Sequence, residues 1–304
     1  MFDQRDLRYV ITVAEEGGFT AASRKLNVAQ SAISRRISLL ETELGGKLFL
    51  RRKNGVEATE AGERFITRAH EILQSMRHAR DEISSLLGEP SGSVAIGVPP
   101  TAGEVLMPEV FRICRERWPN LKIKVQESYS ADTYRAVLRN ELDIGFVHDP
   151  VSNPELTIIP LFPEPMHFIT RPDTRPPARV PISWLSEKRI ILPDTPFGLR
   201  QLLETYAGEH GSPVVVASEV NGVSVTKAMV MAGLGNTVLS YSAVVSEVAA
   251  GKLVSRPLDP PLSWELCVIF RNDRAGNRSF VEVERVAEAV VQQFAKKGVL
   301  MPVR

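Results

Sequence analysis

The sequence has few of the features that mark several classes of protein. Only two of its 304 residues are cysteines, Cys114 and Cys267, so a disulfide-stapled fold is excluded and a reducing, cytoplasmic location is expected. No run of roughly 18 uncharged apolar residues occurs, so we expect no membrane span and no membrane partner. No apolar signal core follows the charged first residues. A composition that is 43% hydrophobic and 24% charged also excludes a disordered chain.

Proline is missing from the first 89 residues, although 21 prolines follow from Pro90 onward. Because proline breaks helices and sheet ladders, the segment before Pro90 is predicted to be helical. The cluster of proline, glycine and serine at residues 89–93 predicts a hinge. The sequence therefore predicts two parts of different character, and the chain is long enough for each to bury a core of its own.

A helix-turn-helix is predicted near the N-terminus. The spacing of apolar residues indicates a helix over about 4–16 that Asp3 caps, a second one that Thr20 caps and that ends at about Leu26, and a third one over 30–44. A tight turn joins the second to the third. In such a motif the second helix enters the major groove, and the polar face of residues 30–44 carries side chains suited to base edges. The alternative is an ordinary solvated helix face. The candidate groove contacts are Gln30, Ser31, Ser34, Arg35 and Arg36.

The net charge of +1 argues against a nucleic-acid-binding protein, but the charge is unevenly distributed. Residues 24–53 contain eight basic and two acidic side chains, a local charge of +6. Residues 51–55 predict a basic hairpin that turns at Asn54-Gly55 and lies against phosphates or the minor groove. A solubilising turn is the alternative. The candidate contacts in this wing are Arg51, Arg52 and Lys53.

A long helix is predicted from Thr59, its cap, to about Leu87. Its inward positions recur at spacings of four and three residues, which is a heptad seam. A seam this narrow favours pairing with a second copy of the helix over packing on its own domain, which is the alternative. A homodimer places two reading helices on a two-fold operator. The predicted seam consists of Phe65, Ala69, Ile72, Met76, Ala79, Ile83 and Leu86.

One ordered set of residues extends over the N-terminal part: Phe19-Thr20-x-Ala22, Leu26, Gln30-Ser31-Ala32-Ile33-Ser34, Ile37, Leu40-Glu41, Leu44-Gly45, Leu48-Phe49, Arg51 and Thr59-x-Ala61-Gly62. Through this set, residues 1 to about 87 resemble the DNA-binding region and linker helix of LysR-type transcriptional regulators, and the rest of the chain follows the plan of that family. Ser23 and Ser31 stand where the family more often has alanine and proline, and the change at Ser31 affects an expected DNA contact. Features at 99–101 and 232–239 resemble the nitrogen-assimilation-control branch.

The resemblance implies an α+β multidomain chain that regulates transcription. Its parts are a winged helix-turn-helix at 1–58, a linker and dimerisation helix at 59–88, a hinge at 89–93, and at 94–304 a two-lobed α/β effector domain of the periplasmic-binding-protein type. Lobe I is expected at about 94–161 and 267–304, and lobe II at about 162–266. The implied partners are double-stranded promoter DNA, which the protein bends, a small-molecule co-inducer between the lobes, further copies of the chain in a dimer of dimers, and RNA polymerase.

The C-terminal part independently predicts alternating strands and helices, which indicates parallel α/β units. The first unit has strands at 93–98, 121–127 and 142–147 and helices at 102–118 and 131–140. A second unit has strands near 189–192, 214–219 and 237–240 and helices near 198–210 and 224–233. The final strand at 265–270 and helix at 279–296 resemble the return to the first lobe that the family makes.

Ligands of open parallel sheets bind beyond the C-terminal ends of the strands, which defines a candidate effector site. Thr101 and Ser130 each precede a helix, where hydroxyl and N–H groups favour an anion, and Arg200 adds a charge partner. The alternatives are simple N-caps, lobe packing for Phe197 and a surface position for Arg200. We expect a carboxylate or another anion as effector and no cofactor. The candidate residues are Pro100, Thr101, Tyr129, Ser130, His148, Phe197, Arg200, Asn221 and Val223.

Catalysis has almost no support in the sequence. It contains no nucleophile elbow, no phosphate-binding loop and no metal-ligand motif, and its five histidines show no ligand-like pairing, so we expect neither an enzyme nor a metal site. An exported solute-binding protein is disfavoured because of the N-terminal module. Cys114 and Cys267 lie in apolar patterns and are predicted to be buried and inert, in contrast to the thiols of peroxide sensors.

Overall fold

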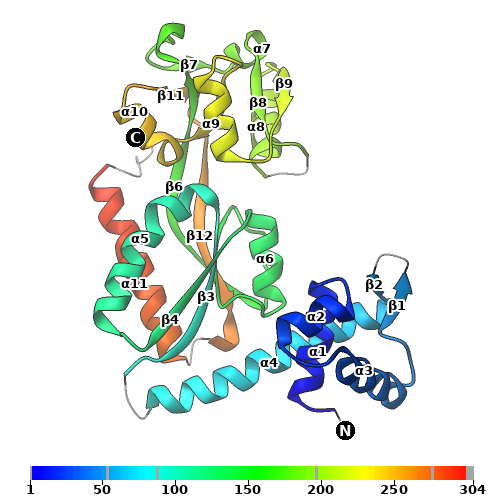
Figure 1. The fold of residues 1–304 in the computed structure, drawn as a ribbon. Helices are drawn as coiled ribbons and strands as arrows, with labels where there is room; N and C mark the ends of the chain where they lie inside the picture. Colours follow the sequence, from blue (N-terminus) through cyan, green and yellow to red (C-terminus); the bar gives the residue numbers. More distant parts are fainter. Residues whose placement is uncertain (1, 53–54, 87–88, 196–197, 275–276, 299–304) are drawn as a thin grey trace. The chain divides into compact units, whose positions relative to one another are not determined.

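The computed structural model describes residues 2–52, 55–86, 89–195, 198–274 and 277–298. The chain forms two compact units (Figure 1): residues 1–83 with 139–141, and residues 84–138 with 142–304. None of the described helices combines the length and the apolar character that a membrane span needs.

The first unit is helical apart from one hairpin, as the missing proline predicts. Three short helices are followed by two antiparallel strands, which pair Phe49 with Ala58 and Arg52 with Gly55, and by one long helix. The elements are α1 (Gln4–Glu15), α2 (Phe19–Leu26), α3 (Gln30–Leu44), β1 (Phe49–Arg52), β2 (Gly55–Ala58) and α4 (Glu60–Leu86). The predicted helix-turn-helix, wing and long helix are confirmed, whereas the turn residues 53–54 lie outside the described part.

Side chains at the predicted caps explain where these helices begin and end. The carboxylate of Asp3 accepts from the backbone N–H groups of Arg5 and Asp6, and the carboxylate of Asp6 accepts from the backbone N–H of Asp3. The helix α1 therefore starts with a capping box. Thr59 accepts from the N–H of Gly62 at 3.0 Å at the start of α4. The prediction that Thr20 caps α2 is wrong, because the helix already includes Phe19 and Gly18 occupies the cap position.

A small core holds the first unit together. Val10 and Val13 of α1 pack on Ile33 and Ile37 of α3, and all four are at most 2% exposed. Apolar residues at spacings of three and four place these side chains on one face of each helix. The opposite face of α3 is thereby left at the surface.

The second unit contains two lobes, each with its own core. Lobe I has the predicted parallel alternation, with β3 paired to both β4 and β5. Its elements are β3 (Gly92–Val98), α5 (Pro100–Arg117), β4 (Leu121–Glu127), α6 (Ser130–Leu138), β5 (Ile144–His148) and α11 (Arg278–Lys296), with a 3₁₀ turn at Asn272–Arg274.

Lobe II is built from the middle of the chain. Its strands β8 and β9 are parallel, and β10 and β11 both pair antiparallel with a longer strand, β6. The elements are β7 (Val180–Pro181), α7 (Trp184–Glu187), β8 (Ile190–Leu192), α8 (Gly198–Glu209), β9 (Val216–Glu219), α9 (Val223–Met231), β10 (Thr237–Ser240), α10 (Val245–Ala249) and β11 (Val254–Asp259), with 3₁₀ turns at Pro172–Thr174 and Tyr241–Val244.

Two strands run through both lobes and join them (Figure 1): β6 (Leu156–Thr170) and β12 (Ser263–Arg271). They pair antiparallel from Ser263 to Arg271, and the sheet they belong to runs in the order β4-β3-β5-β12-β6-β11-β7, with β10 also on β6. Neither β6 nor the pairing of β11 was predicted from the sequence. Because β6 pairs antiparallel with β11 and β12, the sheet is mixed and not parallel throughout. The expected lobe boundaries at 161 and 266 fall inside β6 and β12.

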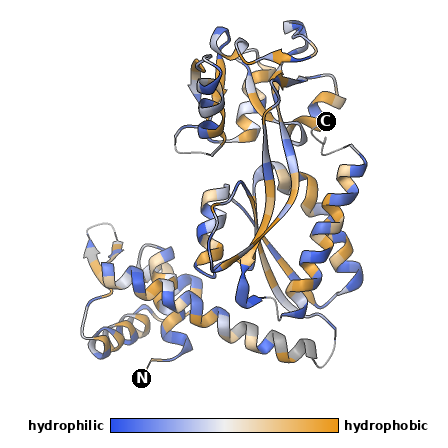
Figure 2. Cartoon of the chain, turned by 180° about the vertical axis from the view of Figure 1, so that it is seen from behind, coloured by the Kyte–Doolittle hydropathy of each residue, from blue (hydrophilic) through white to orange (hydrophobic). Residues whose placement is uncertain are grey.

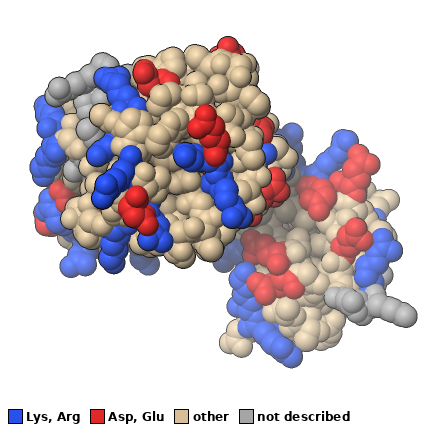
Figure 3. All heavy atoms as spheres, turned by 90° about the horizontal axis from the view of Figure 1, so that it is seen from above, with Lys and Arg blue, Asp and Glu red and all other residues tan. Residues whose placement is uncertain are grey.

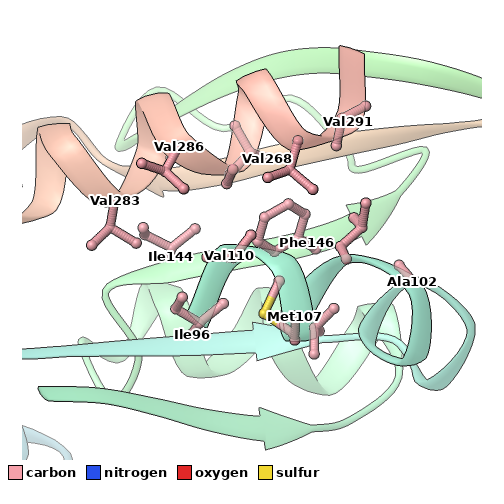
Figure 4. Close-up of a cluster of buried hydrophobic side chains, with 14 of the residues drawn as sticks. Ile96, Ala102, Met107, Val110, Ile144, Phe146, Val268, Val283, Val286 and Val291 are labelled. Atoms are coloured by element: carbon pink, nitrogen blue, oxygen red, sulfur yellow. The ribbon is translucent and has the colours of Figure 1, made fainter. Parts of the chain in front are cut away.

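Separate hydrophobic clusters fill the two lobes. In lobe I, valines of α11 point toward Ile144 and Phe146 of β5, and α5 supplies Met107 and Val110 (Figure 4). In lobe II, Met166 and Phe168 of β6 pack on Leu203 of α8. Figure 2 shows hydrophobic residues concentrated along the strands at the centre of the second unit. Each lobe is therefore a packed body, and the strands between them are the connection.

We predict that Gly62→Ala destabilises the first unit, whereas Gly46→Ala does not. A Cβ at Gly62 runs into the carbonyl oxygen of Leu48, while one at Gly46 meets nothing within 4 Å. Overpacking of this kind costs about 1–3 kcal/mol. Hydrogen exchange of the α1–α3 amides measures the free energy of opening in both variants, and equal protection contradicts the prediction.

Candidate functional site

The outer face of α3 presents most of the predicted groove contacts. Gln30, Ser31 and Arg35 are exposed and Ser34 is half-buried. They occupy the first turns of α3 because Ile33 and Ile37 face the core. The arrangement matches the N-terminal end of a recognition helix, whose short hydroxyls allow close approach to a duplex. The α3 reading face comprises Gln30, Ser31, Ser34 and Arg35.

Arg36 does not belong to this face, which corrects its assignment as a groove contact. Its Nε and Nη2 atoms donate to the two carboxylate oxygens of Asp6 at 2.6 Å each, and Nη2 lies 3.0 Å from Asp3. Asp6 is only 3% exposed, so its charge needs this cation. One step along the helix from Arg35, the side chain turns toward α1 and ties the two helices together.

Two basic residues of the predicted wing, Arg51 and Arg52, lie on β1. Arg52 is exposed and forms a surface ion pair with Glu57 of β2 at 2.9 Å. An exposed pair of this kind contributes little and exchanges readily for a phosphate. Lys53 and the side chain of Arg51 lie outside the described part. Figure 3 shows basic and acidic side chains interspersed on the face that it draws.

The predicted heptad seam divides into two parts. Ala69 is buried and Phe65 half-buried in the core of the first unit, where they pack on Leu7 and Ile11 of α1, so the seam loses its first two members. The physical reason is that α1 covers the beginning of α4. Further along, Ile72, Met76 and Ile83 are 41%, 49% and 58% exposed, and Ala79 is exposed as well. The side chain of Leu86 lies outside the described part.

A cavity of about 780 Å³ lies between lobe I and lobe II. Its lining is mostly apolar and includes six of the nine predicted effector residues, contributed by four different segments of the chain. Those six are Pro100, Thr101, Tyr129, Ser130, His148 and Val223. The volume is in the range of sites for small organic ligands.

The other three candidates have different positions. The guanidinium of Arg200 pairs with Glu204 and Glu219 and donates to the carbonyl of Pro193, which is itself a lining residue. Asn221 uses its side-chain oxygen to accept from the backbone of Asp194. Neither Arg200 nor Asn221 is among the residues that line the cavity, so their roles toward an effector stay predictions. Phe197 lies outside the described part.

Sequence reasoning missed several residues of the cavity wall. Thr226 follows the predicted helix start at 224 by two residues, Ser240 ends a predicted strand, and Gln201 and Thr205 lie on α8. Thr226 lies three residues after Val223, and Gln201 lies three residues after Gly198. Residues at this spacing share one face of a helix, which is the sequence signal for both. Trp264 comes from β12, whose crossing of both lobes had no sequence signal.

Four helices begin at the cavity wall. The first residues of α5 and α6 come from lobe I, and those of α8 and α9 from lobe II. Each helix start has backbone N–H groups without intrahelical acceptors and a positive end of the dipole. No side-chain cap hydrogen bond is found at α5 or α9. Among the described lining residues the cationic side chain is Arg135, and it already pairs with Asp132 at 2.6 Å.

Polar contacts join the lobes beside the cavity. The Tyr129 hydroxyl of lobe I donates to the Asn221 carbonyl of lobe II at 2.8 Å. On α9, Lys227 donates to the Ala243 carbonyl at 3.0 Å, pairs with Glu247 at 2.8 Å and lies 3.8 Å from Glu104 of α5. The helix α5 also lies against the 3₁₀ turn at Tyr241–Val244, so the lobes are joined by packing and hydrogen bonds as well as by the crossing strands.

The floor of the cavity contains a buried pair of hydrogen-bonded side chains. His148 Nε2 lies 2.7 Å from Glu164 Oε2, and both side chains are 2% exposed. Burial raises the pKa of Glu164, but the hydrogen bonds from His148 and Ser242 outweigh it, so the net pKa lies below the ordinary value. The imidazole stacks on Trp264 with ring centroids 3.9 Å apart.

The two cysteines are buried free thiols, as predicted. Burial raises the pKa of both Cys114 and Cys267 to about 11. At neutral pH the reactive thiolate is therefore rare. Within the described residues no group of three His, Cys, Asp or Glu side chains is arranged to hold a metal ion.

We predict that Arg36→Ala lowers the melting temperature of the first unit, whereas Arg35→Ala leaves it unchanged. The first substitution strips the buried Asp6 carboxylate of its cation, and the second removes an exposed side chain. Hydrogen exchange of α1 distinguishes the two variants. A stable Arg36→Ala protein would show that the ion pair is dispensable.

Comparisons with known proteins agree with this geometry. The chain matches the model of the bacterial regulatory helix-turn-helix proteins of the lysR family at residues 4–63 and the LysR substrate binding domain at 87–295. It is 29% identical to the HTH-type transcriptional regulator BbuR of Bordetella bronchiseptica over 289 residues, which is 94% of this chain and 89% of BbuR. The nitrogen assimilation regulatory protein nac of Klebsiella aerogenes is 27% identical over 265 residues, 86% of each protein.

Full-length CbnR in complex with its target DNA has the same fold, with a TM-score of 0.70, 18% identity and coverage of 95% of this chain and 100% of CbnR. The nac protein is no more similar than BbuR, so identity does not single out its branch. The relatives are transcriptional regulators, not enzymes. The substrate binding domain model covers more than half of the chain, and it contains the interlobe cavity. The chain therefore belongs to the LysR family of DNA-binding transcriptional regulators, which respond to small-molecule effectors.

Proposed function

We propose that this regulator senses a small organic acid bound in the cavity between its lobes. The observation that carries the proposal is the convergence of four helix N-termini, two from each lobe, on one mostly apolar cavity of about 780 Å³. Helix N-termini favour a negative charge. The apolar lining favours a hydrocarbon body, which an inorganic anion lacks.

The effector acts on DNA by changing the angle between the lobes. A ligand that contacts helix starts of both lobes binds most tightly at one lobe angle, so it shifts the population toward that angle. Contacts between the lobes, such as those of Tyr129 and Lys227, rearrange in this movement. The resulting rearrangement of the assembled chains alters how their reading helices meet the promoter and how far the DNA bends.

The DNA complex that we propose contains at least two copies of the chain. The exposed side chains of Ile72, Met76 and Ile83 on α4 form an apolar strip that a second α4 covers, and two such dimers form a homotetramer. Each α3 reading face enters a major groove and each wing lies on the backbone. The setting is the cytoplasm, where promoter DNA and RNA polymerase are available as partners.

We predict that two arginine substitutions affect DNA binding in different ways. Arg35→Ala removes a side chain suited to paired bonds with guanine and lowers base discrimination by about 1–3 kcal/mol. Arg52→Ala weakens binding to all sequences alike. It also reduces the slope of the logarithm of the binding constant against the logarithm of salt concentration by about one. Gel shifts on the upstream region of the gene at several salt concentrations measure both effects.

The reverse pattern, with sequence preference lost at Arg52 and kept at Arg35, contradicts the assignment of α3 as the reading helix. A protein that binds no promoter fragment selectively at any salt concentration contradicts the proposed function itself. Glu60→Ala on α4 is the control, because it removes an exposed charge that belongs neither to α3 nor to the wing strands.

We predict that organic carboxylates raise the melting temperature of the second unit and that sulfate does not. Binding to the folded state stabilises by about 2.7 kcal/mol at a hundredfold excess over Kd. Thr101→Val removes a hydroxyl from the cavity wall and reduces the shift, whereas Ser186→Ala, outside the cavity lining, preserves it. Stabilisation by sulfate alone, or by no carboxylate in a panel, would contradict an organic acid as effector.

A further inference from the structure

A continuous chain of hydrogen bonds runs beneath the cavity from one lobe to the other. It starts on the cavity wall at the beginning of α6, passes through β5 and the crossing strand β6, and returns to the cavity wall at the end of β10. Its two ends therefore face the same ligand space from opposite lobes. The members are Ser130, His148, Glu164, Ser242 and Ser240.

Glu164 sets the direction of the bonds that reach it. Its carboxylate is buried, and hydrogen bonds hold its pKa below the ordinary value despite burial, so it is ionised at neutral pH. An ionised carboxylate only accepts hydrogen bonds. It accepts from His148 Nε2 at 2.7 Å on one oxygen and from Ser242 at 2.6 Å on the other.

Toward lobe I, Ser130 Oγ accepts from the backbone N–H of His148 at 3.0 Å. The ring Nδ1 of His148 lies 3.5 Å from the same oxygen, at the outer limit of a hydrogen bond. The hydroxyl hydrogen of Ser130 is therefore available to a ligand acceptor in the cavity, such as a carboxylate oxygen.

Toward lobe II the same carboxylate makes Ser240 an acceptor. Ser242 donates its single hydrogen to Glu164 Oε1 at 2.6 Å, so it accepts in its 3.0 Å contact with Ser240. Ser240 thereby uses its own hydrogen and offers lone pairs to the cavity. Its side chain is 2% exposed, so a ligand that supplies no donor leaves this acceptor without compensation.

We propose that the effector is a hydroxy- or amino-carboxylic acid, whose carboxylate accepts from Ser130 and whose hydroxyl or ammonium group donates to Ser240. This inference rests on the proposed function, because it assumes an acid in the interlobe cavity. The inference narrows the class of effector to acids that carry a hydrogen-bond donor in addition to the accepting carboxylate. Ser242 is a positioning residue, since it acts on the ligand only through Ser240.

The test compares acids that differ only in the donor, using calorimetric titration of the full chain. Mandelate is paired with phenylacetate, and malate with succinate. We expect at least one hydroxy acid to bind about tenfold or more tightly than its deoxy partner, because an unsatisfied buried acceptor costs about 1–3 kcal/mol. The ratio of the two dissociation constants is the readout.

Three serine variants locate the discrimination. Ser240→Ala removes the acceptor, so the ratio falls toward one while the deoxy acid binds as before. Ser242→Ala frees the Ser240 hydroxyl to donate or accept, and the ratio falls part of the way. Ser255→Ala is the matched control, because Ser255 is a buried serine of lobe II that bonds to His167 outside the chain and should leave the ratio unchanged. A merely structural role moves both affinities together.

The outcomes separate this inference from the proposed function. If the deoxy acids bind as tightly as the hydroxy acids, or if Ser240→Ala keeps the full preference, the donor requirement is overturned and an organic-acid effector still stands. If no acid of either kind binds to a protein that still binds its promoter, the organic-acid effector fails and the donor requirement fails with it.

Discussion

The architecture of the sensing part depends on the pairing of β6 with β12. These two strands are antiparallel over Ser263–Arg271, and both run through lobe I and lobe II. A pair of twisted strands resists stretching but bends more easily than a packed core, so it defines an axis about which the lobes can rotate. The same strands bring Glu164 and Trp264 beneath the cavity. The connection between the lobes and the floor of the ligand site are therefore one element.

The buried Glu164 shows how such a floor becomes chemically specific. An ionised carboxylate inside a protein needs hydrogen bonds on both oxygens, and His148 of β5 and Ser242 of the 3₁₀ turn at Tyr241–Val244 supply them. The consequence extends to the cavity wall, because Ser242 donates to Glu164 and therefore accepts from Ser240. One buried carboxylate thus decides the hydrogen-bonding character that Ser240 offers to a ligand.

In the first unit a second buried carboxylate has a different effect. Asp6 recruits Arg36 from the helix that carries the groove contacts. This pair explains why neighbouring arginines of one basic helix have separate roles, one in stability and the other at the surface. It also shows why local charge is a coarse guide to a DNA interface, since part of the positive charge of residues 24–53 is neutralised by α1 and by Glu57 of the wing.

The sequence by itself determined the helix-turn-helix, the wing, the long α4 and the alternation of strands and helices, because these depend on caps, turns and apolar spacing within short segments. It also located the helix starts at the cavity, including Thr101, Ser130 and Val223. Only the tertiary structure decided that α1 covers Phe65 and Ala69, that Arg36 and Arg200 are held by carboxylates, and that β6 and β12 cross both lobes. The reason is physical: partners such as Asp6 and Arg36, or Glu164 and Ser242, are far apart in the chain, and no periodicity records which of them meet.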